Sequence, residues 1–153
     1  MTDNASEMTL ESLRSVPLFA SLDDQTASSL RSLLKFKDVP SGTQLFRKGQ
    51  SGDAMYLVES GRVRISITDN DGHELTLAEN AQGDFFGEMA LIDGRQRSAD
   101  AQVIADARLA ILSRQDFLSF VRSSPDMALE MLAALTDRLR RTDELLRGRV
   151  SRN

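Results

Sequence analysis

The chain has 153 residues, of which 41% are hydrophobic, and it contains no Cys, no Trp and one His, so it fits a single globular domain. The absence of Cys excludes disulfides, thiolate metal sites and thiol nucleophiles, and one His cannot build a multi-histidine metal site. A net charge of −4 argues against a broad basic surface for nucleic acid, and the polar start with no long apolar run predicts a cytoplasmic chain without membrane contact.

Residues 1–35 are expected to form a helical segment that packs on the rest of the chain. Apolar residues spaced three apart precede Pro17: Leu10, Leu13 and Val16. Asp23 can cap a second helix, in which several apolar residues share one face.

Residues 36–113 have the pattern of an antiparallel β-roll. Short alternating runs are separated by Gly or Asp-Gly, as around Val63, Ile65 and Ile67, which precede a turn at 69–72. Two further strands are expected at 97–105 and 107–112. The repeated glycines suit a roll in which the chain bends through positive φ.

Residues 114–153 return to a helical period. Ser113 can cap a helix over 114–122, and Pro125 suits the first turn of a long final helix. Residues with heptad spacing follow in that helix: Ala128, Leu132, Leu135, Leu139, Thr142 and Leu146. This spacing favours a dimer seam, and a helix packed on its own barrel is the alternative.

Residues 83–99 interrupt the strand pattern with one helical turn between glycines. A helix that begins after Gly87 directs backbone N–H groups toward an anion. Arg97 can add a bidentate contact to that anion, and it is expected to be the only full positive charge near it. Ser98 adds a hydroxyl donor. Glu88 fits beside an anion only if it accepts from a neutral group such as a sugar hydroxyl. The segment therefore predicts a ligand with one phosphate and a free hydroxyl.

The run FGEMALIDGRQRSADA at residues 86–101 resembles the phosphate-binding cassette of the cyclic-nucleotide-binding domain family. Upstream segments at 16–19, 47–56 and 59–63 match as well, and the likeness extends over 10–146. The resemblance implies a mainly β fold with flanking α: an antiparallel β-roll, jelly-roll-like or double-stranded β-helix. N-terminal helices, a short cassette helix and a long C-terminal helix complete that fold.

The family resemblance also implies a set of ligand-binding residues: Gly87, Glu88, Met89, Ala90, Arg97, Ser98 and Thr142. In such domains the cassette Glu, here Glu88, binds the ribose 2′-hydroxyl, and the cassette Arg, here Arg97, pairs with the cyclic phosphate. The cassette amides add donors. In the bacterial activators a Thr on the long helix, here Thr142, reaches the adenine amino group.

The function implied by the family is a non-enzymatic sensor that binds cAMP, less favourably cGMP, and couples binding to movement of its C-terminal helix. A homodimer through that helix is expected, and no cofactor, metal or catalytic residue is. Bacterial activators of the family continue into a winged helix-turn-helix. This chain ends at Asn153, so no nucleic-acid binding is expected through it, and its unfinished basic helix suggests a fragment of a larger protein.

Two other functions are alternatives. The first is a dimerisation or scaffold module of the same fold, with a vestigial pocket or a different ligand. The second, and the least favoured, is a small β-barrel enzyme with Glu88 and Asp84 as acid and base. Asp84 and Asp93 fit turn or cap positions better, and His73 fits a solvated hairpin. Tyr56 and the Phe residues are expected in the core.

Overall fold

The computed structural model describes the chain from residue 9 to residue 151, apart from the side chains at positions 138, 142 and 147–151. Its elements, in chain order, are α1 (Leu10–Arg14), the 3-10 helix η2 (Pro17–Phe19), α2 (Asp24–Arg31), β1 (Lys35–Val39), β2 (Gln44–Phe46), β3 (Ala54–Thr68), β4 (Glu74–Asn80), β5 (Phe85–Phe86), α3 (Met89–Asp93), β6 (Asp100–Ser113), α4 (Arg114–Arg122) and α5 (Pro125–Ser151).

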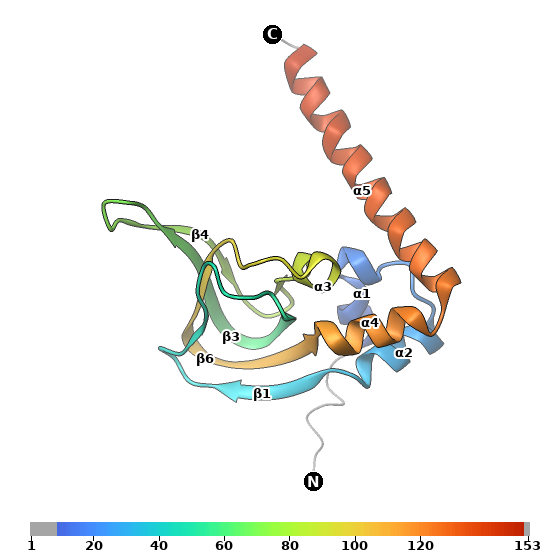
Figure 1. Cartoon of the computed structure of the whole chain (residues 1–153), viewed down its shortest axis with the longest axis horizontal. Helices are drawn as coiled ribbons and strands as arrows, with labels where there is room; N and C mark the ends of the chain where they lie inside the picture. Colours follow the sequence, from blue (N-terminus) through green and yellow to red (C-terminus); the bar gives the residue numbers. More distant parts are fainter. Residues whose placement is uncertain (1–8, 152–153) are drawn as a thin grey trace.

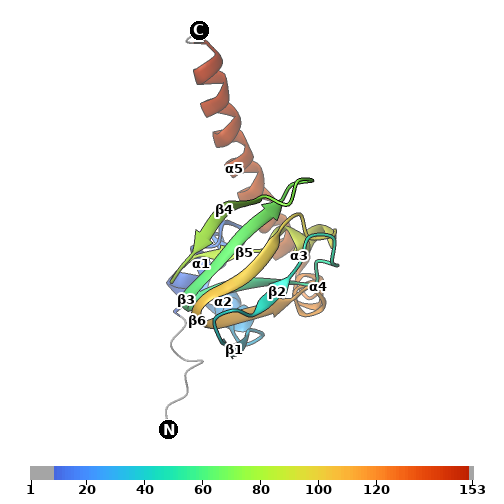
Figure 2. The same cartoon turned by 90° about the vertical axis from the view of Figure 1, so that its left-hand side faces the viewer.

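The strands form one antiparallel sheet in the order β1-β6-β3-β4, with β2 added to β6 and β5 added to β3. The two long central strands bend, and the sheet curls into the expected β-roll (Figures 1 and 2). Register shifts between Val58 and Val63 of β3 accompany this bend. Such irregularities increase local twist and redirect a strand. The mainly β fold with flanking helices is thereby confirmed.

One strand prediction was wrong in its bounds. The two strands expected at 97–105 and 107–112 are the single strand β6, which continues through the bend and begins only at Asp100. The sequence suggests a break near residue 106. In the structure the pairing shifts there instead, between Ser60–Arg108 and Arg62–Ala105, and the strand continues. Arg97 therefore lies in the loop before β6.

Two apolar clusters form the core. In the larger one the helices pack over one end of the sheet, through fully buried side chains such as Leu13, Phe19 and Leu112. In the smaller one, inside the roll, Val63 and Val103 pack with the ring of Phe86. The second cluster lies directly behind the segment that sequence analysis singled out, so that segment has a fixed support.

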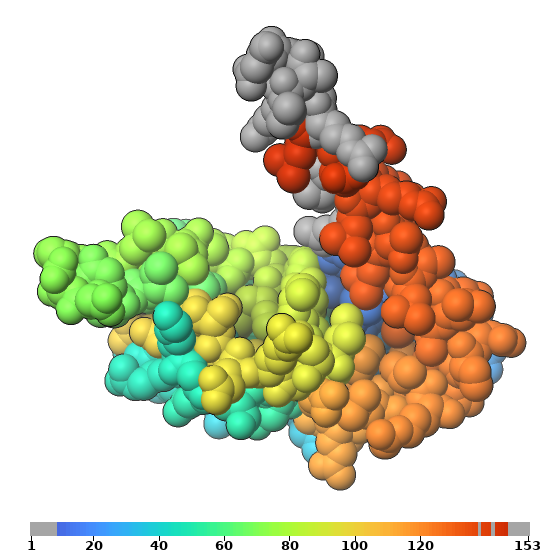
Figure 3. Space-filling model, turned by 45° about the horizontal axis from the view of Figure 1, so that its top comes forward, coloured from blue at the N-terminus to red at the C-terminus, as the bar shows by residue number. Residues whose placement is uncertain are grey.

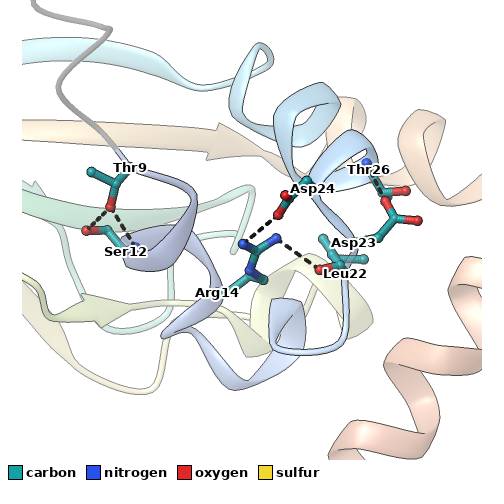
Figure 4. A network of polar contacts seen from close by, with 7 residues as sticks. All are labelled: Thr9, Ser12, Arg14, Leu22, Asp23, Asp24 and Thr26. Atoms are coloured by element: carbon teal, nitrogen blue, oxygen red, sulfur yellow. Dashed lines mark hydrogen bonds and ion pairs between the residues drawn. The ribbon is translucent and has the colours of Figure 1, made fainter.

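The N-terminal helices are held by local capping, as Figure 4 shows. Asp23 Oδ1 accepts a hydrogen bond from the Thr26 amide at 2.8 Å, which confirms it as the cap of α2. The Thr26 donors lower the pKa of Asp23, with a smaller contribution from Arg14. Arg14 also pairs with Asp24 at 2.9 Å and donates to the Leu22 carbonyl at 3.2 Å, which ties α1 to α2.

The last helix has two differently packed parts. Met127 and Met131 are buried, and Leu135 packs against the larger core cluster, so the first turns of α5 lie on their own chain beside η2 and α4. Farther along, α5 rises away from the roll (Figures 1 and 2). The leucines exposed by half or more on this helix are Leu129, Leu132, Leu139, Leu145 and Leu146. Packing on the barrel thus accounts for only the first turns.

None of the helices described in residues 9–151 is long and apolar enough to cross a membrane.

Candidate functional site

A cavity of about 350 Å³ lies between the cassette helix α3, the inner face of β3 and the edge strand β2. Its apolar wall consists of six residues: Phe46, Ile65, Phe86, Met89, Ala90 and Ala99. Figure 3 shows the cassette residues, in yellow, at the surface between the β3–β4 hairpin and the base of α5. Ligand cavities commonly enclose about 300–1,000 Å³, so this space suits a small ligand.

Arg97 is the buried charge in this cavity, with only 6% of the residue exposed. Its Nη2 donates a hydrogen bond to the Ala54 carbonyl at 2.7 Å and lies 3.8 Å from Asp53 Oδ1, on a largely exposed side chain. Its Nε is buried and has no hydrogen-bond partner among the described residues. The guanidinium is thus only partly satisfied by its own chain, which favours an anion beside it.

Burial lowers the pKa of Arg97, opposed by its electrostatic interactions with Tyr56 and Asp53. An arginine starts from so high a pKa that the guanidinium keeps its proton at neutral pH. Burial raises the pKa of Tyr56, with Arg97 opposing that change. The cavity therefore presents a permanent positive charge, and the Tyr56 phenol near that charge, which is not part of the cavity lining, stays neutral.

Two aromatic rings lie beside the Arg97 guanidinium, and a third packs against both of them. Its central carbon lies 4.1 Å from the Phe46 ring centroid and 5.9 Å from that of Tyr56. Tyr56 and Phe86 stack at 5.0 Å, and Phe46 lies against both of them. These rings were expected in the core, and they do pack in the smaller core cluster, but the contact of two of them with Arg97 was not predicted. β2 pairs with β6, and β5 pairs with β3, so the three rings come together only in the folded sheet. Residue spacing alone gives no signal for this cluster.

The loop before β6 holds Arg97 in place through backbone pairing with residues 49–52. The Arg97 amide donates to the Gln50 carbonyl at 2.7 Å, and the Gly49 amide donates to the Arg97 carbonyl at 2.8 Å. A Cβ on Gly52 would lie 2.5 Å from the Arg95 carbonyl oxygen, so this approach requires glycine. The loop is therefore held by irregular backbone pairing, which directs the Arg97 side chain toward the cavity.

Gly87 is a second position that requires glycine. Its φ is +82°, and a Cβ there would lie 2.8 Å from Arg97 Nη1 and 3.1 Å from the Ala54 carbonyl oxygen. Glycine adopts this backbone conformation without a steric penalty. Gly87 thus permits the close approach of the cassette backbone to the guanidinium.

The short helix α3 begins after this glycine, with Glu88 at its N-cap position. The Ala90 amide donates to the Gly87 carbonyl at 3.2 Å, so it is already used within the turn. Gly94, in the left-handed conformation, ends the helix and returns its amide to the Ala90 carbonyl at 3.0 Å. The helix is therefore a single capped turn at the edge of the cavity.

Of the residues predicted to bind a ligand, the structure brings five together as lining of the cavity: Gly87, Met89, Ala90, Arg97 and Ser98. Glu88 is half-buried beside them but is not among the lining residues. Thr142 lies on α5, and its side chain is outside the described residues. Its role stays a prediction.

Arg97 is not the only cationic residue near this space, contrary to the expectation from the sequence. Arg95 also lines the cavity, with a side chain that is 85% exposed and lies 3.9 Å from Asp93. Because it is solvated and paired, it contributes a weaker field than the buried Arg97.

Asp84, one of the two carboxylates considered as an acid–base pair, serves a turn, and so does Asp93. Asp84 Oδ2 accepts from the Ala81 amide at 2.8 Å, and Asp93 Oδ1 accepts from the Arg95 amide at 2.9 Å. In the β3–β4 hairpin, Asp69 Oδ1 accepts from the amide of the exposed His73 at 2.9 Å. These contacts confirm the turn and hairpin assignments made from the sequence.

The chain matches a known family of domains. Residues 36–124 match the family model described as the cyclic nucleotide-binding domain. The chain is 38% identical over 144 residues to the cyclic AMP receptor protein of Thermus thermophilus, covering 92% of this chain and 67% of that protein.

Two solved structures are also similar. The N-terminal domain of a transcriptional regulator from Streptomyces coelicolor A3(2) is 32% identical, with a TM-score of 0.81 over 88% of this chain and 94% of that one. The regulatory domain of Toxoplasma gondii PKA, solved with cAMP, is 29% identical, with a TM-score of 0.71 over 78% of this chain and 46% of that one. The chain thus spans about two thirds of the Thermus protein and under half of the Toxoplasma chain.

Proposed function

The chain belongs to the cyclic nucleotide-binding domain family, and from this we propose that it is a non-enzymatic sensor that binds cAMP in the cavity around Arg97. The observation that carries the proposal is the burial of Arg97, only 6% exposed, in the wall of the cavity, with its guanidinium 3.8 Å from the carboxylate of Asp53. A phosphate in the cavity would supply the missing acceptor and a full counter-charge.

The other predicted residues have roles that fit the same ligand. The Ser98 hydroxyl and the backbone around Gly87 and Met89 would donate to the phosphate oxygens. Glu88 would accept from the ribose 2′-hydroxyl at the rim of the cavity. The apolar wall that includes Ile65 offers contact area for the remaining, uncharged part of the nucleotide.

We assign the preference for cAMP over cGMP to Thr142 of α5. The support is the similarity to one protein named as a cyclic AMP receptor and to another solved with cAMP. The Thr142 hydroxyl would accept from the exocyclic amino group of adenine. It would discriminate against guanine, which carries an acceptor there, when its own proton is held by a backbone carbonyl of the helix. Either the same chain or a second copy could bring this residue to the base.

The proposed signal passes from the cavity to α5 through Arg114, the first residue of α4. Arg114 Nη2 donates to the Ile92 carbonyl at the end of α3 at 3.2 Å, and its amide donates to the Asp53 carbonyl at 2.7 Å. α4 in turn packs against α5. If the nucleotide binds more tightly when α3 is in one of two positions, it shifts the equilibrium between the two matching positions of α4 and α5. The size of that shift is set by the difference in affinity.

We further propose a homodimer through α5. Leu139 is 70% exposed and shares the heptad stripe with Leu132 and Leu146, which are also exposed. A sustained apolar heptad is buried most directly by the same stripe of a second helix. The three segments 1–35, 36–113 and 114–153 would then serve as support, binding roll and output helix.

Calorimetric titration of cAMP and cGMP tests the proposal. Wild type should bind cAMP saturably and more tightly than cGMP. Arg97→Ala should weaken cAMP by about a hundredfold or more, because charged hydrogen bonds contribute about 1.5–3 kcal/mol each. Arg108→Ala is the matched control, since Arg108 pairs with Asp38 outside the cavity. Absence of binding to wild type would favour a scaffold module.

A further inference from the structure

Phe46 contacts the buried charge of Arg97 and also lines the cavity. Its ring centroid lies 4.1 Å from the central guanidinium carbon of Arg97, and the same side chain lines the cavity. Nothing in the family likeness of the cassette involves this residue, which lies on the three-residue edge strand β2. Its position therefore calls for a physical explanation of its own.

The chemistry of the guanidinium explains why a ring helps here. The electron-rich face of an aromatic ring attracts a cation, and the attraction grows when the cation is desolvated, as Arg97 is. The N–H donors of a guanidinium lie in its plane and point outward from its edges. A ring on the planar face stabilises the charge without using any of these donors.

The remaining contacts leave one buried donor of this charge, Nε, without an acceptor among the described residues. Nη2 is used by the Ala54 carbonyl at 2.7 Å. The guanidinium is thus held closely by the Phe46 ring, more distantly by the Tyr56 ring, and at one corner by a carbonyl. The Arg97 side chain is therefore already ordered before an anion binds, so binding costs little additional conformational entropy.

Phe46 is itself held by its neighbours. Its ring lies 5.9 Å from Tyr56 and 6.1 Å from Phe86, and those two rings stack on each other at 5.0 Å. The backbone of β2 is fixed by its pairing with Ala101 of β6. Because the Phe46 ring is packed in this way, it can hold the Arg97 side chain in a defined position.

We propose that Phe46 is a positioning residue for ligand binding, whose ring holds the Arg97 guanidinium so that its free N–H edge meets the ligand phosphate. The inference rests on the proposed function for the identity of the ligand. It adds that affinity depends on the electronic character of this ring as well as on its volume.

Calorimetric titration of cAMP into three variants tests this role. Phe46→Leu should weaken binding about five- to tenfold, consistent with loss of one desolvated cation–π contact. Phe46→Trp should stay near wild type, since a larger ring offers the stronger cation–π partner. Phe36→Leu is the matched control. Arg108 lies over Phe36 at 5.1 Å outside the cavity, so this change should lower the melting temperature and leave cAMP affinity unchanged.

A series of fluorinated phenylalanines at position 46 separates electronics from shape. Each added fluorine withdraws charge from the ring face, so the cAMP dissociation constant should rise stepwise with the number of fluorines. A flat series, or wild-type affinity in Phe46→Leu, would overturn the proposal and leave the ring as a space-filling residue.

Failure of the proposed function would be recognised separately, as absence of cAMP binding to wild type. The positioning role can still be measured in the ligand-free protein by the NMR order parameter of the Arg97 Nε–H bond. It should fall in Phe46→Leu and stay unchanged in Phe36→Leu. An unchanged order parameter in Phe46→Leu would contradict the inference whatever the ligand.

Discussion

The cavity around Arg97 and the outer part of α5 differ in what covers their unusual groups. Arg97 is a charge enclosed by its own chain, between the Phe46 ring and the Ala54 carbonyl. Leu139 is an apolar side chain on a helix that rises away from the roll, and it is 70% exposed (Figure 1). A single chain thus encloses the Arg97 charge but leaves the outer leucines of α5 exposed to water.

This difference separates two kinds of interaction. A buried guanidinium with an unused donor favours a small anion that completes an existing enclosure. A stripe of exposed leucines favours a large apolar partner surface, because burial of each Leu stabilises association without directional chemistry. Variants in the two regions should therefore affect ligand affinity and assembly independently.

The largest effect is expected on assembly. Leu139→Glu places a charge in the proposed seam of both helices, and burial of one Leu contributes about 1.5–3 kcal/mol. The dissociation constant of the dimer should rise by about a hundredfold or more in sedimentation experiments. The fold of each chain should be unaffected.

Leu77→Glu is the control for that experiment. Leu77 is also an exposed leucine, but it lies on β4, away from the heptad stripe. This variant should dimerise like wild type. A wild-type chain that is monomeric at tens of micromolar, or equal loss of dimer in both variants, would refute the α5 seam.

Gly87→Ala should have the next largest effect. An L side chain at positive φ costs about 1–2 kcal/mol, and here its Cβ would also press on Arg97 Nη1. We expect a loss of about 2–3 kcal/mol in the free energy of unfolding by urea, together with weaker cAMP binding. Gly83→Ala isolates the backbone cost, because Gly83 has φ +90° and open space around a Cβ. Equal losses of stability and affinity in both variants would contradict the close approach.

A smaller effect is expected when the proposed link between the two regions is removed. Arg114→Met loses one hydrogen bond to the Ile92 carbonyl, a contribution of about 1 kcal/mol. Affinity for cAMP should change less than about threefold. The cAMP-dependent change in distance between spin labels on the roll and on α5 should fall. Arg122→Met, at the other end of α4, should retain that change. If both variants retain it, the signal does not pass through Arg114.

The smallest effect concerns the cap of α2. Hydrogen bonds from Thr26 hold the pKa of Asp23 below its unfolded value. A depressed carboxyl pKa contributes stability above the unfolded pKa, and this is lost as pH falls through the folded pKa. The difference in melting temperature between wild type and Asp23→Ala should therefore narrow below about pH 4. Asp23→Asn keeps a neutral capping oxygen, so its advantage over Asp23→Ala should not vary with pH.

Features that depend on nearby residues could be predicted from the sequence. The caps Asp23 and Ser113, the place of Pro125 in α5 and the helical turn after Gly87 all follow from local chemistry. The same cassette indicated Arg97, which the structure places in the cavity with Gly87 and Ser98.

Features that depend on tertiary pairing could not be predicted in this way. β6 runs through a bend that is visible only in its shifted pairing with β3. Phe46 and Tyr56 reach Arg97 because three strands converge, although they are far from it in the chain. The division of α5 into a packed part, with Met127 and Met131, and an exposed part depends on where the body of the domain ends.

The central claim is that cAMP binds with its phosphate on Arg97. The most direct measurement is an NMR titration that follows the side-chain Nε–H signal of Arg97 and the backbone amides of residues 86–99. The account predicts that cAMP shifts the Arg97 signal strongly downfield and that the cassette amides titrate with the same dissociation constant. Saturation by cAMP with the Arg97 signal unmoved, and with shifts clustered elsewhere, would contradict it.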